Sequence, residues 1–314
     1  MKVISKSGYE EIALVYIAET ESGKLIEFVE SLQPPLPREK KWVLIISTLY
    51  GCPVKCLICD AGLDYSGRIS KEDLFAQIDY LVLKRYPDRK IKTEKFKIQF
   101  ARMGEPAFNN AVLDVIEEFG DRYQAPGFVP SISTIAPSGR DEFFERLLQI
   151  KNSKFPAGKF QFQFSIHTTD VEIRDILMPV KKMSFSEMAL FGGNFFRSGD
   201  NKLTLNFCIV NELPVEPLKI FKYFDPDKFI IKITPLNPTY SALQNMLTPT
   251  SFDVSDLKLN NLVEKFQKLS YEVIVSEGER IENQIGSNCG QYVLKHLKNH
   301  IKHSAGYKII ANIN

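Results

Sequence analysis

Three of the chain's five cysteines lie close together in one short segment, in the spacing Cys-x3-Cys-x2-Cys. They are Cys52, Cys56 and Cys59, and the apolar run at residues 42–46 precedes them. Three thiolates on one loop can bind three irons of a cuboidal [4Fe-4S] cluster and leave the fourth iron open to a substrate or cofactor. The spacing therefore predicts an iron–sulfur cluster with one open coordination position.

Two other uses of these cysteines compete with the cluster. A structural zinc site needs a fourth ligand and is usually built from two paired Cys-x2-Cys knuckles, whereas the sequence has no second knuckle. Disulfides are disfavoured because three is an odd number and no secretion signal precedes the segment. Zinc remains the main alternative.

The composition indicates one large α/β domain. The chain has 314 residues, of which 44% are hydrophobic, so it can bury a large core. Its 40 basic and 38 acidic residues leave a net charge of +2, which neither requires nor excludes a nucleic-acid partner. No segment reaches the roughly 18 to 20 apolar residues of a membrane span. We expect a cytoplasmic protein whose cysteines are kept reduced.

From residue 42 onward, short β-rich runs alternate with helical runs, which is typical of βα units around a parallel sheet. The predicted strands are residues 42–47, 96–101, 129–134, 160–166, 203–210 and 229–234. The predicted helices between them are residues 71–85, 111–119, 140–150, 184–195 and 216–221. Six such units predict an α/β fold of the partial (βα)6 TIM-like barrel type.

The flanking segments complete the expected organisation. Residues 10–32 alternate apolar and polar positions around the turn at 19–24 and predict a β-hairpin, followed by a linker at 33–41. A helix at 254–269 and an extended run at 271–276 follow the sixth unit. We therefore expect an N-terminal hairpin and linker (1–41), a barrel (42–276) and a C-terminal loop with a basic helix (277–314).

Polar residues follow several of the predicted strands, at the end where parallel βα folds carry their chemistry. After the second strand, Gly104 permits a close backbone approach and Glu105 can accept hydrogen bonds from an ammonium group. Each such residue alone is more commonly part of a turn or a helix cap. Their recurrence at one end of the sheet favours ligand contacts. Besides Gly104 and Glu105, the residues of this kind are Ser133, Ser165, His167 and Asn237.

A fourth cysteine stands far from the first three, in the polar segment Asn288-Cys289-Gly290-Gln291. Structural free cysteines usually occur in apolar runs, so Cys289 is a candidate reactive thiol. Cys208, in contrast, lies inside a predicted strand and is most simply a buried packing residue.

These motifs together resemble the radical S-adenosylmethionine superfamily and, within it, the adenine-methylating RlmN and Cfr enzymes. The resemblance runs from about residue 27 to residue 291. It implies that Cys52, Cys56 and Cys59 bind the [4Fe-4S] cluster and that Cys289 is methylated first. The segments that contact S-adenosylmethionine in this family correspond to Gly104, Glu105, Ser133, Ser165, Ile166, His167 and Asn237.

The resemblance also implies a reaction that uses two molecules of S-adenosylmethionine. One methylates Cys289 by nucleophilic displacement. The second yields a radical that removes a hydrogen atom from the S-methyl group, and the methylene radical formed on that group adds to an sp2 carbon. We expect an RNA adenine as substrate and a low-potential electron donor such as flavodoxin or ferredoxin. The alternative substrates are a peptide, a nucleotide or a small molecule.

The sequence departs from the family at several points. The family has a second catalytic cysteine seven residues before the first cluster cysteine, where this chain has Ile45. The family's N-terminal RNA-binding module has no counterpart ahead of the hairpin. Glu27 lies near a proposed base of the family, but we expect it to be a solvent-facing strand carboxylate. Near the C-terminus, His296, His300 and His303 share one face of a predicted helix, which we expect to be solvated rather than metal-binding.

Overall fold

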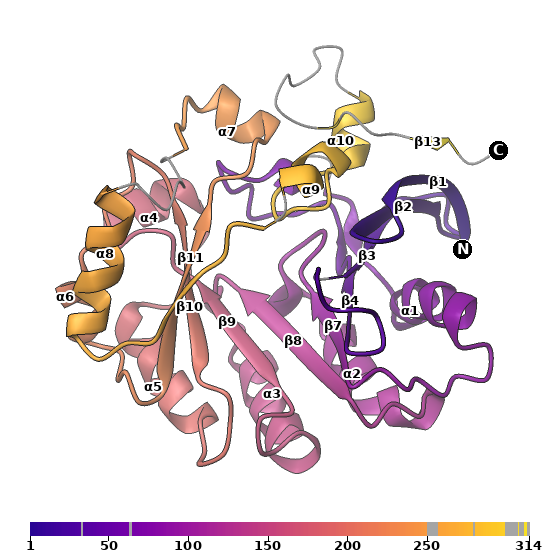
Figure 1. The fold of residues 1–314 in the computed structure, drawn as a ribbon, viewed down its shortest axis with the longest axis horizontal. Helices are drawn as coiled ribbons and strands as arrows, with labels where there is room; N and C mark the ends of the chain where they lie inside the picture. The colour runs from indigo at the N-terminus through magenta and orange to yellow at the C-terminus, as the bar shows by residue number, and fades with distance from the viewer. Residues whose placement is uncertain are drawn as a thin grey trace.

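The computed structural model describes residues 1–32, 34–62, 65–249, 257–278, 280–298, 307 and 311–312. In these residues one sheet has eleven strands in the order β12-β11-β10-β9-β8-β7-β4-β3-β2-β1-β13 (Figure 1). Its strands are β1 (Lys2–Tyr9), β2 (Ala13–Glu19), β3 (Leu25–Ser31), β4 (Lys41–Ile46), β7 (Lys95–Phe100), β8 (Phe128–Thr134), β9 (Gln161–Ser165), β10 (Leu203–Ile209), β11 (Phe229–Pro235), β12 (Val273–Val275) and β13 (Ala311–Asn312). The short strands β5 (Leu49–Tyr50) and β6 (Gly67–Arg68) pair separately.

The part of the sheet from β4 to β12 is parallel throughout. All six predicted barrel strands are confirmed, with ends that differ from the prediction by no more than one residue. The expected extended run at 271–276 corresponds to the seventh parallel strand, β12. The fold is therefore the α/β partial barrel that the sequence predicts.

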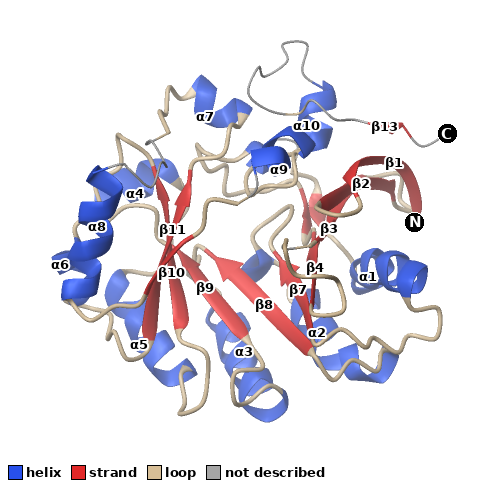
Figure 2. Ribbon diagram, viewed as in Figure 1, coloured by secondary structure: helices blue, strands red, loops and turns tan. Residues whose placement is uncertain are grey.

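Helices cover one side of the parallel strands (Figure 2). Local sequence explains several of their ends, because Ser70 caps α1 by accepting a hydrogen bond from Asp73 N at 3.0 Å, and Ser184 and Glu187 form a capping box on α5. The helices between β4 and β12 are α1 (Lys71–Arg85), α2 (Ala111–Arg122), α3 (Asp141–Lys154), α4 (Val171–Leu177), α5 (Phe185–Phe195), α6 (Pro217–Phe221), α7 (Tyr240–Gln244) and α8 (Leu257–Lys268). The first three residues of the helix predicted at 254–269 lie outside the described residues.

The two faces of the parallel strands differ in burial. On β4, Trp42, Leu44 and Ile46 are fully buried and share one hydrophobic core with the helices, whereas the alternate residues are partly exposed. The same alternation runs through β7 and β11. Since successive side chains of a strand point to opposite faces, the partly exposed set lines the inner face of the curved sheet.

The N-terminal strands extend the barrel sheet. The hairpin predicted at 10–32 is confirmed as β2 and β3, and β3 pairs antiparallel with β4. The prediction missed β1, whose sequence KVISKSGY is mostly polar and carries only a weak two-residue alternation. The division into segments at residues 41 and 276 stays a prediction.

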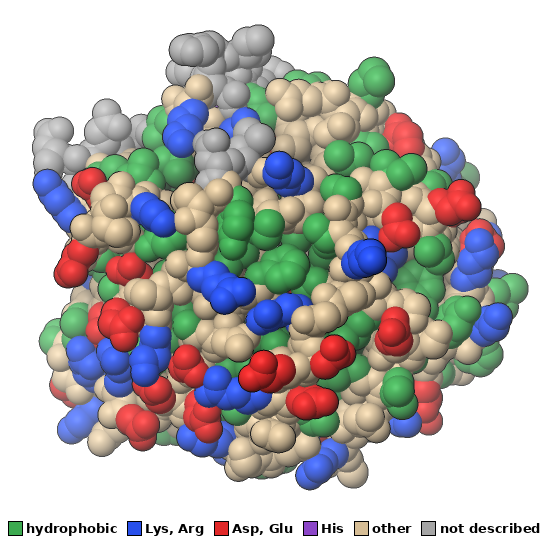
Figure 3. Space-filling view, turned by 180° about the vertical axis from the view of Figure 1, so that it is seen from behind, with side chains coloured by type: hydrophobic (Ala, Val, Ile, Leu, Met, Phe, Trp, Pro, Cys, Tyr) green, Lys and Arg blue, Asp and Glu red, His purple; other side chains and the backbone are tan. Residues whose placement is uncertain are grey.

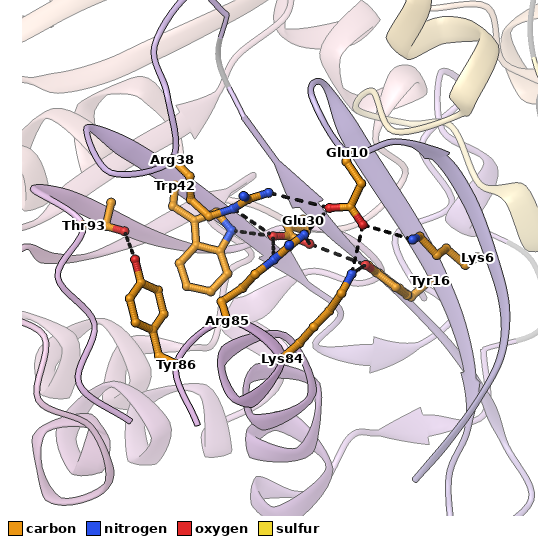
Figure 4. A network of polar contacts seen from close by, with 10 residues as sticks. All are labelled: Lys6, Glu10, Tyr16, Glu30, Arg38, Trp42, Lys84, Arg85, Tyr86 and Thr93. Atoms are coloured by element: carbon orange, nitrogen blue, oxygen red, sulfur yellow. Dashed lines mark hydrogen bonds and ion pairs between the residues drawn. The ribbon is translucent and has the colours of Figure 1, made fainter. Parts of the chain in front are cut away.

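A polar network fastens the N-terminal strands to α1 (Figure 4). At its centre the carboxylate of Glu30 accepts hydrogen bonds from Arg85 Nε at 3.0 Å and from Trp42 Nε1 at 3.1 Å. We call this group the Glu30 network; its members are Lys6, Glu10, Tyr16, Glu30, Arg38, Trp42, Lys84 and Arg85. It joins β1, β2, β3 and α1 through paired charges.

The C-terminal part adds α9 (Arg280–Ile285), α10 (Val293–Lys298) and the edge strand β13. The expectation that the histidines face solvent is wrong for His296, which is buried with its Nδ1 2.6 Å from the hydroxyl of Tyr240. Stacking on Tyr307, with ring centroids 4.6 Å apart, explains the burial. His300 and His303 lie outside the described residues. Among the helices that the structure describes, none is long and apolar enough to cross a membrane.

Candidate active site

The cysteine loop is held at the carboxyl end of the parallel strands by backbone hydrogen bonds to three distant segments. Leu57 N donates to Leu177 O at 3.0 Å, and Thr48 N donates to Met103 O at 2.8 Å. Asp60 N donates to Gly290 O at 2.9 Å, next to Cys289. The loop is therefore in contact both with the Gly-Glu-Pro segment after β7 and with the fourth cysteine.

The three thiols of the loop are partly exposed and interact with one another. Burial raises the pKa of Cys52 to about 11, and burial together with the neighbouring thiols raises the pKa values of Cys56 and Cys59 still further. Thiolates in such surroundings require a compensating positive charge. Within the part of the chain that the structure describes, no three His, Cys, Asp or Glu side chains converge tightly enough to hold one metal ion.

Glu105, predicted to bind an ammonium group, is a buried carboxylate that accepts hydrogen bonds from its own chain. Its carboxylate accepts hydrogen bonds from Ile135 N at 3.0 Å, Ala107 N at 3.1 Å and the hydroxyl of Thr134. Burial nevertheless raises the pKa of Glu105 to about 7. Gly104 beside it has a φ of +100°, and a Cβ there would stand 2.5 Å from Leu49, so the close approach requires glycine.

The other predicted strand-end residues reach the same end of the sheet in different ways. Ser133 and Ser165 are partly exposed on the inner face. The side chain of Ile166 is buried in the core, so only its backbone can face this end. His167 accepts a hydrogen bond at Nδ1 from Cys208 N at 3.2 Å, and burial lowers its pKa to about 4, so its imidazole is neutral with the proton on Nε2.

Cys289 lies on a loop that packs directly on the cysteine loop. Asn237 Nδ2 donates to Cys289 O at 3.0 Å, and a Cβ on Gly290 would stand 3.0 Å from Ile58 O. Solvent reaches the thiol, yet protein surrounds it on most sides, so burial raises its pKa while Lys232 and Arg102 lower it. The structure thus brings Cys289 and Asn237 to the three-cysteine loop.

Arg102 is the main residue that the sequence did not single out. Its guanidinium donates to Gly286 O at 2.6 Å, Ser287 O at 3.1 Å and Asn288 O at 3.3 Å. Its place in the same short segment as Glu105 was the available signal. It also corrects the expectation for Glu27, which is not solvent-facing but fully buried, because its carboxylate pairs with Arg102.

Comparisons with known proteins agree with this geometry. No family model matches the chain. It is 24% identical over 291 residues to the probable dual-specificity RNA methyltransferase RlmN of Pseudothermotoga lettingae, covering 90% of this chain and 76% of that protein. It is 25% identical over 274 residues to the dual-specificity RNA methyltransferase RlmN of Vesicomyosocius okutanii, covering 84% and 72%. The chain is an RlmN/Cfr-like protein of the radical S-adenosylmethionine superfamily.

A solved structure shows the same fold. The radical SAM methyltransferase from Sphaerobacter thermophilus superposes with a TM-score of 0.68 at 16% identity, over 93% of this chain and 81% of that one. As a radical S-adenosylmethionine protein, this chain is an enzyme, and its cofactors are a [4Fe-4S] cluster and S-adenosylmethionine. The donor set fits the cluster, because three free cysteine thiols on one loop are the ligands that a cuboidal cluster takes, one on each of three irons.

Two residues bear on the family's second catalytic cysteine. Ile45 stands at that position in this radical SAM enzyme and packs against a group of hydrophobic side chains that includes Val29 and Ile285. It supplies neither a proton acceptor nor a thiol. Cys208 is buried, as expected of a strand thiol, with its Sγ 3.5 Å from Pro235 O. It lies near enough to Cys289 for the charge of that thiol to raise its pKa further.

Proposed function

We propose that this radical SAM enzyme transfers a methyl-derived one-carbon unit through Cys289 to an sp2 carbon of an RNA base, most conservatively an adenine. The observation that carries the proposal is the contact between the two cysteine loops, made by Asp60 N and Gly290 O. A thiol held beside the cluster loop can accept a methyl group and then lie within reach of chemistry at the open iron. The relatives named as RNA methyltransferases support RNA as the substrate class.

The proposal assigns roles to the residues of the site. Cys52, Cys56 and Cys59 would hold the cluster, which supplies one electron to cleave the sulfonium of S-adenosylmethionine when both are bound. Glu105 would accept hydrogen bonds from the methionine ammonium group. Asn237, Ser133, Ser165, the backbone at Ile166, and His167 with its Nε2–H would orient the rest of the cofactor from neighbouring strand ends. Gly104 gives the cofactor room beside the backbone.

Cys289 itself must lose a proton before it can attack a methyl group. The positive charges of Arg102 and Lys232 favour the thiolate, against the desolvation that disfavours it. Arg102 also positions the loop through its three carbonyl contacts. A low-potential donor such as flavodoxin or ferredoxin completes the proposal, since the cluster has to be reduced.

One part of the molecular surface carries charges of both signs. In Figure 3, acidic and basic side chains are interspersed over the lower half of the face shown, with no broad field of one sign there.

Mass spectrometry tests the proposal directly. Protein produced with S-adenosylmethionine available is expected to carry a methyl group on Cys289, and Cys289→Ala to carry none at any cysteine. Anaerobic turnover with methyl-labelled S-adenosylmethionine and total RNA is expected to place the label in a base. A Cys289 that is never methylated, or label that enters a peptide or small molecule instead of RNA, would contradict the proposal. Cys208→Ala is the matched control, because it removes a buried thiol and leaves the Cys289 loop intact.

A further inference from the structure

Lysines gather on the inner face of the sheet. Lys41 lies on β4, Lys95 and Lys97 on β7, and Lys232 on β11; we call these four the inner lysine cluster. On β7 the neighbours Phe96 and Ile98 are buried against the helices, so Lys97 points to the inner face. Ile231 and Ile233 place Lys232 on the same face of β11.

No described carboxylate neutralises the two central lysines. Among the described residues, neither Lys97 nor Lys232 forms an ion pair or a side-chain hydrogen bond, and every charge acting on Lys97 is positive. The strongest comes from Lys232, ahead of Lys41 on the adjacent strand and Lys95 on its own strand. Lys97 and Lys232 therefore face each other across the curve of the sheet. Lysines that are largely surrounded by protein are rarely left without a partner.

A second polar group on this face also has no partner. Asn206 on β10 is only 8% exposed, and its side-chain carbonyl Oδ1 is buried without a hydrogen bond. Asn206 stands opposite Lys232 in the parallel register and opposite Ser165 on the other side. A buried acceptor without a donor is costly, and a ligand that donates a hydrogen bond would remove that cost.

Lys232 connects the polar groups of the inner face that have no partner with the thiol of Cys289. Lys232 acts electrostatically on Cys289 at one end and on Lys97 at the other. The groups assigned to S-adenosylmethionine contacts lie at or just after the ends of β7, β8, β9 and β11. Lys97, in contrast, lies three positions before Phe100, about 10 Å along β7 from its end. Lys97 therefore belongs to a part of the inner face beyond the proposed cofactor contacts.

We propose that the inner face binds the phosphate of the substrate nucleotide, with Lys97 and Lys232 on the phosphate and Asn206 Oδ1 accepting a hydrogen bond from the same nucleotide, while its base faces Cys289. This rests on the proposed function, because it takes Cys289 as the reacting group. Phosphate matches the residues: lysine ammonium groups bind it as compact point charges, and several lysines together suit its multiple anionic oxygens. Enzymes that react with a base also commonly take the whole nucleotide out of the stack.

The protonation of Lys97 supports the assignment. Burial and the charges of Lys232, Lys41 and Lys95 lower the pKa of Lys97 to about 7 in the absence of a ligand. The neighbouring positions Val43 on β4 and Val129 on β8 carry no charge. A bound phosphate would raise that pKa again, so binding should take up a proton near pH 8 and weaken as the pH rises further.

Calorimetric titration with adenosine 5′-monophosphate and with adenosine tests the site on the cluster-loaded, full-length protein. We expect the wild type to bind the monophosphate about tenfold or more tightly than the nucleoside. Lys97→Met and Lys232→Met should abolish this preference, and Lys97→Arg should retain most of it. Lys159→Met is the control, since Lys159 is an exposed lysine ahead of β9. Circular dichroism establishes that each variant is folded.

Three results would overturn the proposal: equal binding of the two ligands by the wild type, a preference that survives both methionine substitutions, or a loss of S-adenosylmethionine affinity with the monophosphate preference intact. The phosphate could belong to RNA or to a free nucleotide. A single-stranded RNA that loses affinity through the same substitutions identifies the RNA backbone as its source. RNA binding that is unaffected while monophosphate binding is lost identifies a free nucleotide.

The same samples separate this inference from the proposed function. Methylation of Cys289 is read by mass spectrometry and does not require a nucleotide. If Cys289 stays unmethylated while the lysines still select the monophosphate, the proposed reaction fails and the phosphate site stands. If Cys289 is methylated but the lysines select no phosphate, the phosphate site fails and the proposed role of Cys289 stands.

Discussion

Two groups of basic side chains lie against the sheet, and they differ in the charges that face them. In the Glu30 network, Arg85 and Arg38 lie 3.0 Å and 3.2 Å from a carboxylate oxygen of Glu30, which is almost fully buried. In the inner lysine cluster, the groups that act on Lys97 are other lysines. The first arrangement neutralises its charges within the chain and serves stability. In the second, Lys97 and Lys232 have no carboxylate partner among the described residues, which we expect to cost stability.

Breaking the neutralised network should have the largest effect. Glu30→Gln removes the buried carboxylate that serves Arg85, Arg38 and Trp42, so the two partly buried arginines keep only the half-exposed Glu10 as an acidic partner. We expect the free energy of unfolding to fall by about 3 kcal/mol. Urea unfolding followed by circular dichroism measures it, with the exposed Glu21→Gln as control. A fall below about 1 kcal/mol would show that the network is not structural.

In the inner lysine cluster we expect a substitution to raise the free energy of unfolding rather than lower it. Lys97→Met keeps the aliphatic bulk of the side chain and removes a cation that only other cations face. We expect the free energy of unfolding to rise by about 1 kcal/mol at pH 7. Urea unfolding in phosphate-free buffer is the measurement, with Lys159→Met expected to change little. Destabilisation by Lys97→Met would remove the contrast between the two groups.

The stabilisation expected from Lys97→Met should depend on pH. The pKa of Lys97 is about 7 in the folded protein against 10.5 for an ordinary lysine, so above pH 7 the unfolded chain binds the extra proton. Wild-type stability therefore gains up to about 1.4 kcal/mol per pH unit as the pH rises from 7. Melting temperatures of both proteins from pH 6 to pH 8.5 should converge above pH 7. A constant difference would exclude titration of Lys97 in this range.

The smallest effect is expected at the solvent-exposed edge of the Glu30 network. Burial would raise the pKa of Glu10, but hydrogen bonds from Arg85, Lys6 and Lys84 lower it to about 2. The side chain is 43% exposed, so Glu10→Gln should cost less than about 1 kcal/mol at pH 7. Because the stabilisation from the lowered pKa is fully present above the ordinary value of 4.5 and is lost as the pH falls toward 2, the effect should shrink at pH 3. Unfolding midpoints at the two pH values report it.

The comparison also explains what the sequence could predict. The barrel strands were predictable because β-rich runs and helical runs alternate regularly, and the cysteine loop because its spacing is local. The Glu30 network and the inner lysine cluster were not, because their members come from distant strands. Lys97 stands in a lysine-rich segment of the sequence, a pattern that is normally a solvated face, and only the pairing of β7 in the sheet shows that it points inward.

The site was predictable to a similar extent. Glu105 and Asn237 follow strands and could be placed by that rule, while their roles stay predictions. Arg102 and Glu27 required the fold, because a strand carboxylate is expected to face water unless a cation from elsewhere meets it. The burial of His296 depends on Tyr307, which the sequence does not place.

The contacts of Arg102 bear on the order in which the molecule is built. They join segments 184 to 186 residues apart in the chain, so they close only after the intervening strands have assembled. Contacts of such long range carry a high loop-closure entropy and form late in folding. The Cys289 loop is thus among the last parts to reach its place. An unfinished or truncated chain would not hold that thiol beside the cysteine loop, so reactivity is tied to completion of the fold.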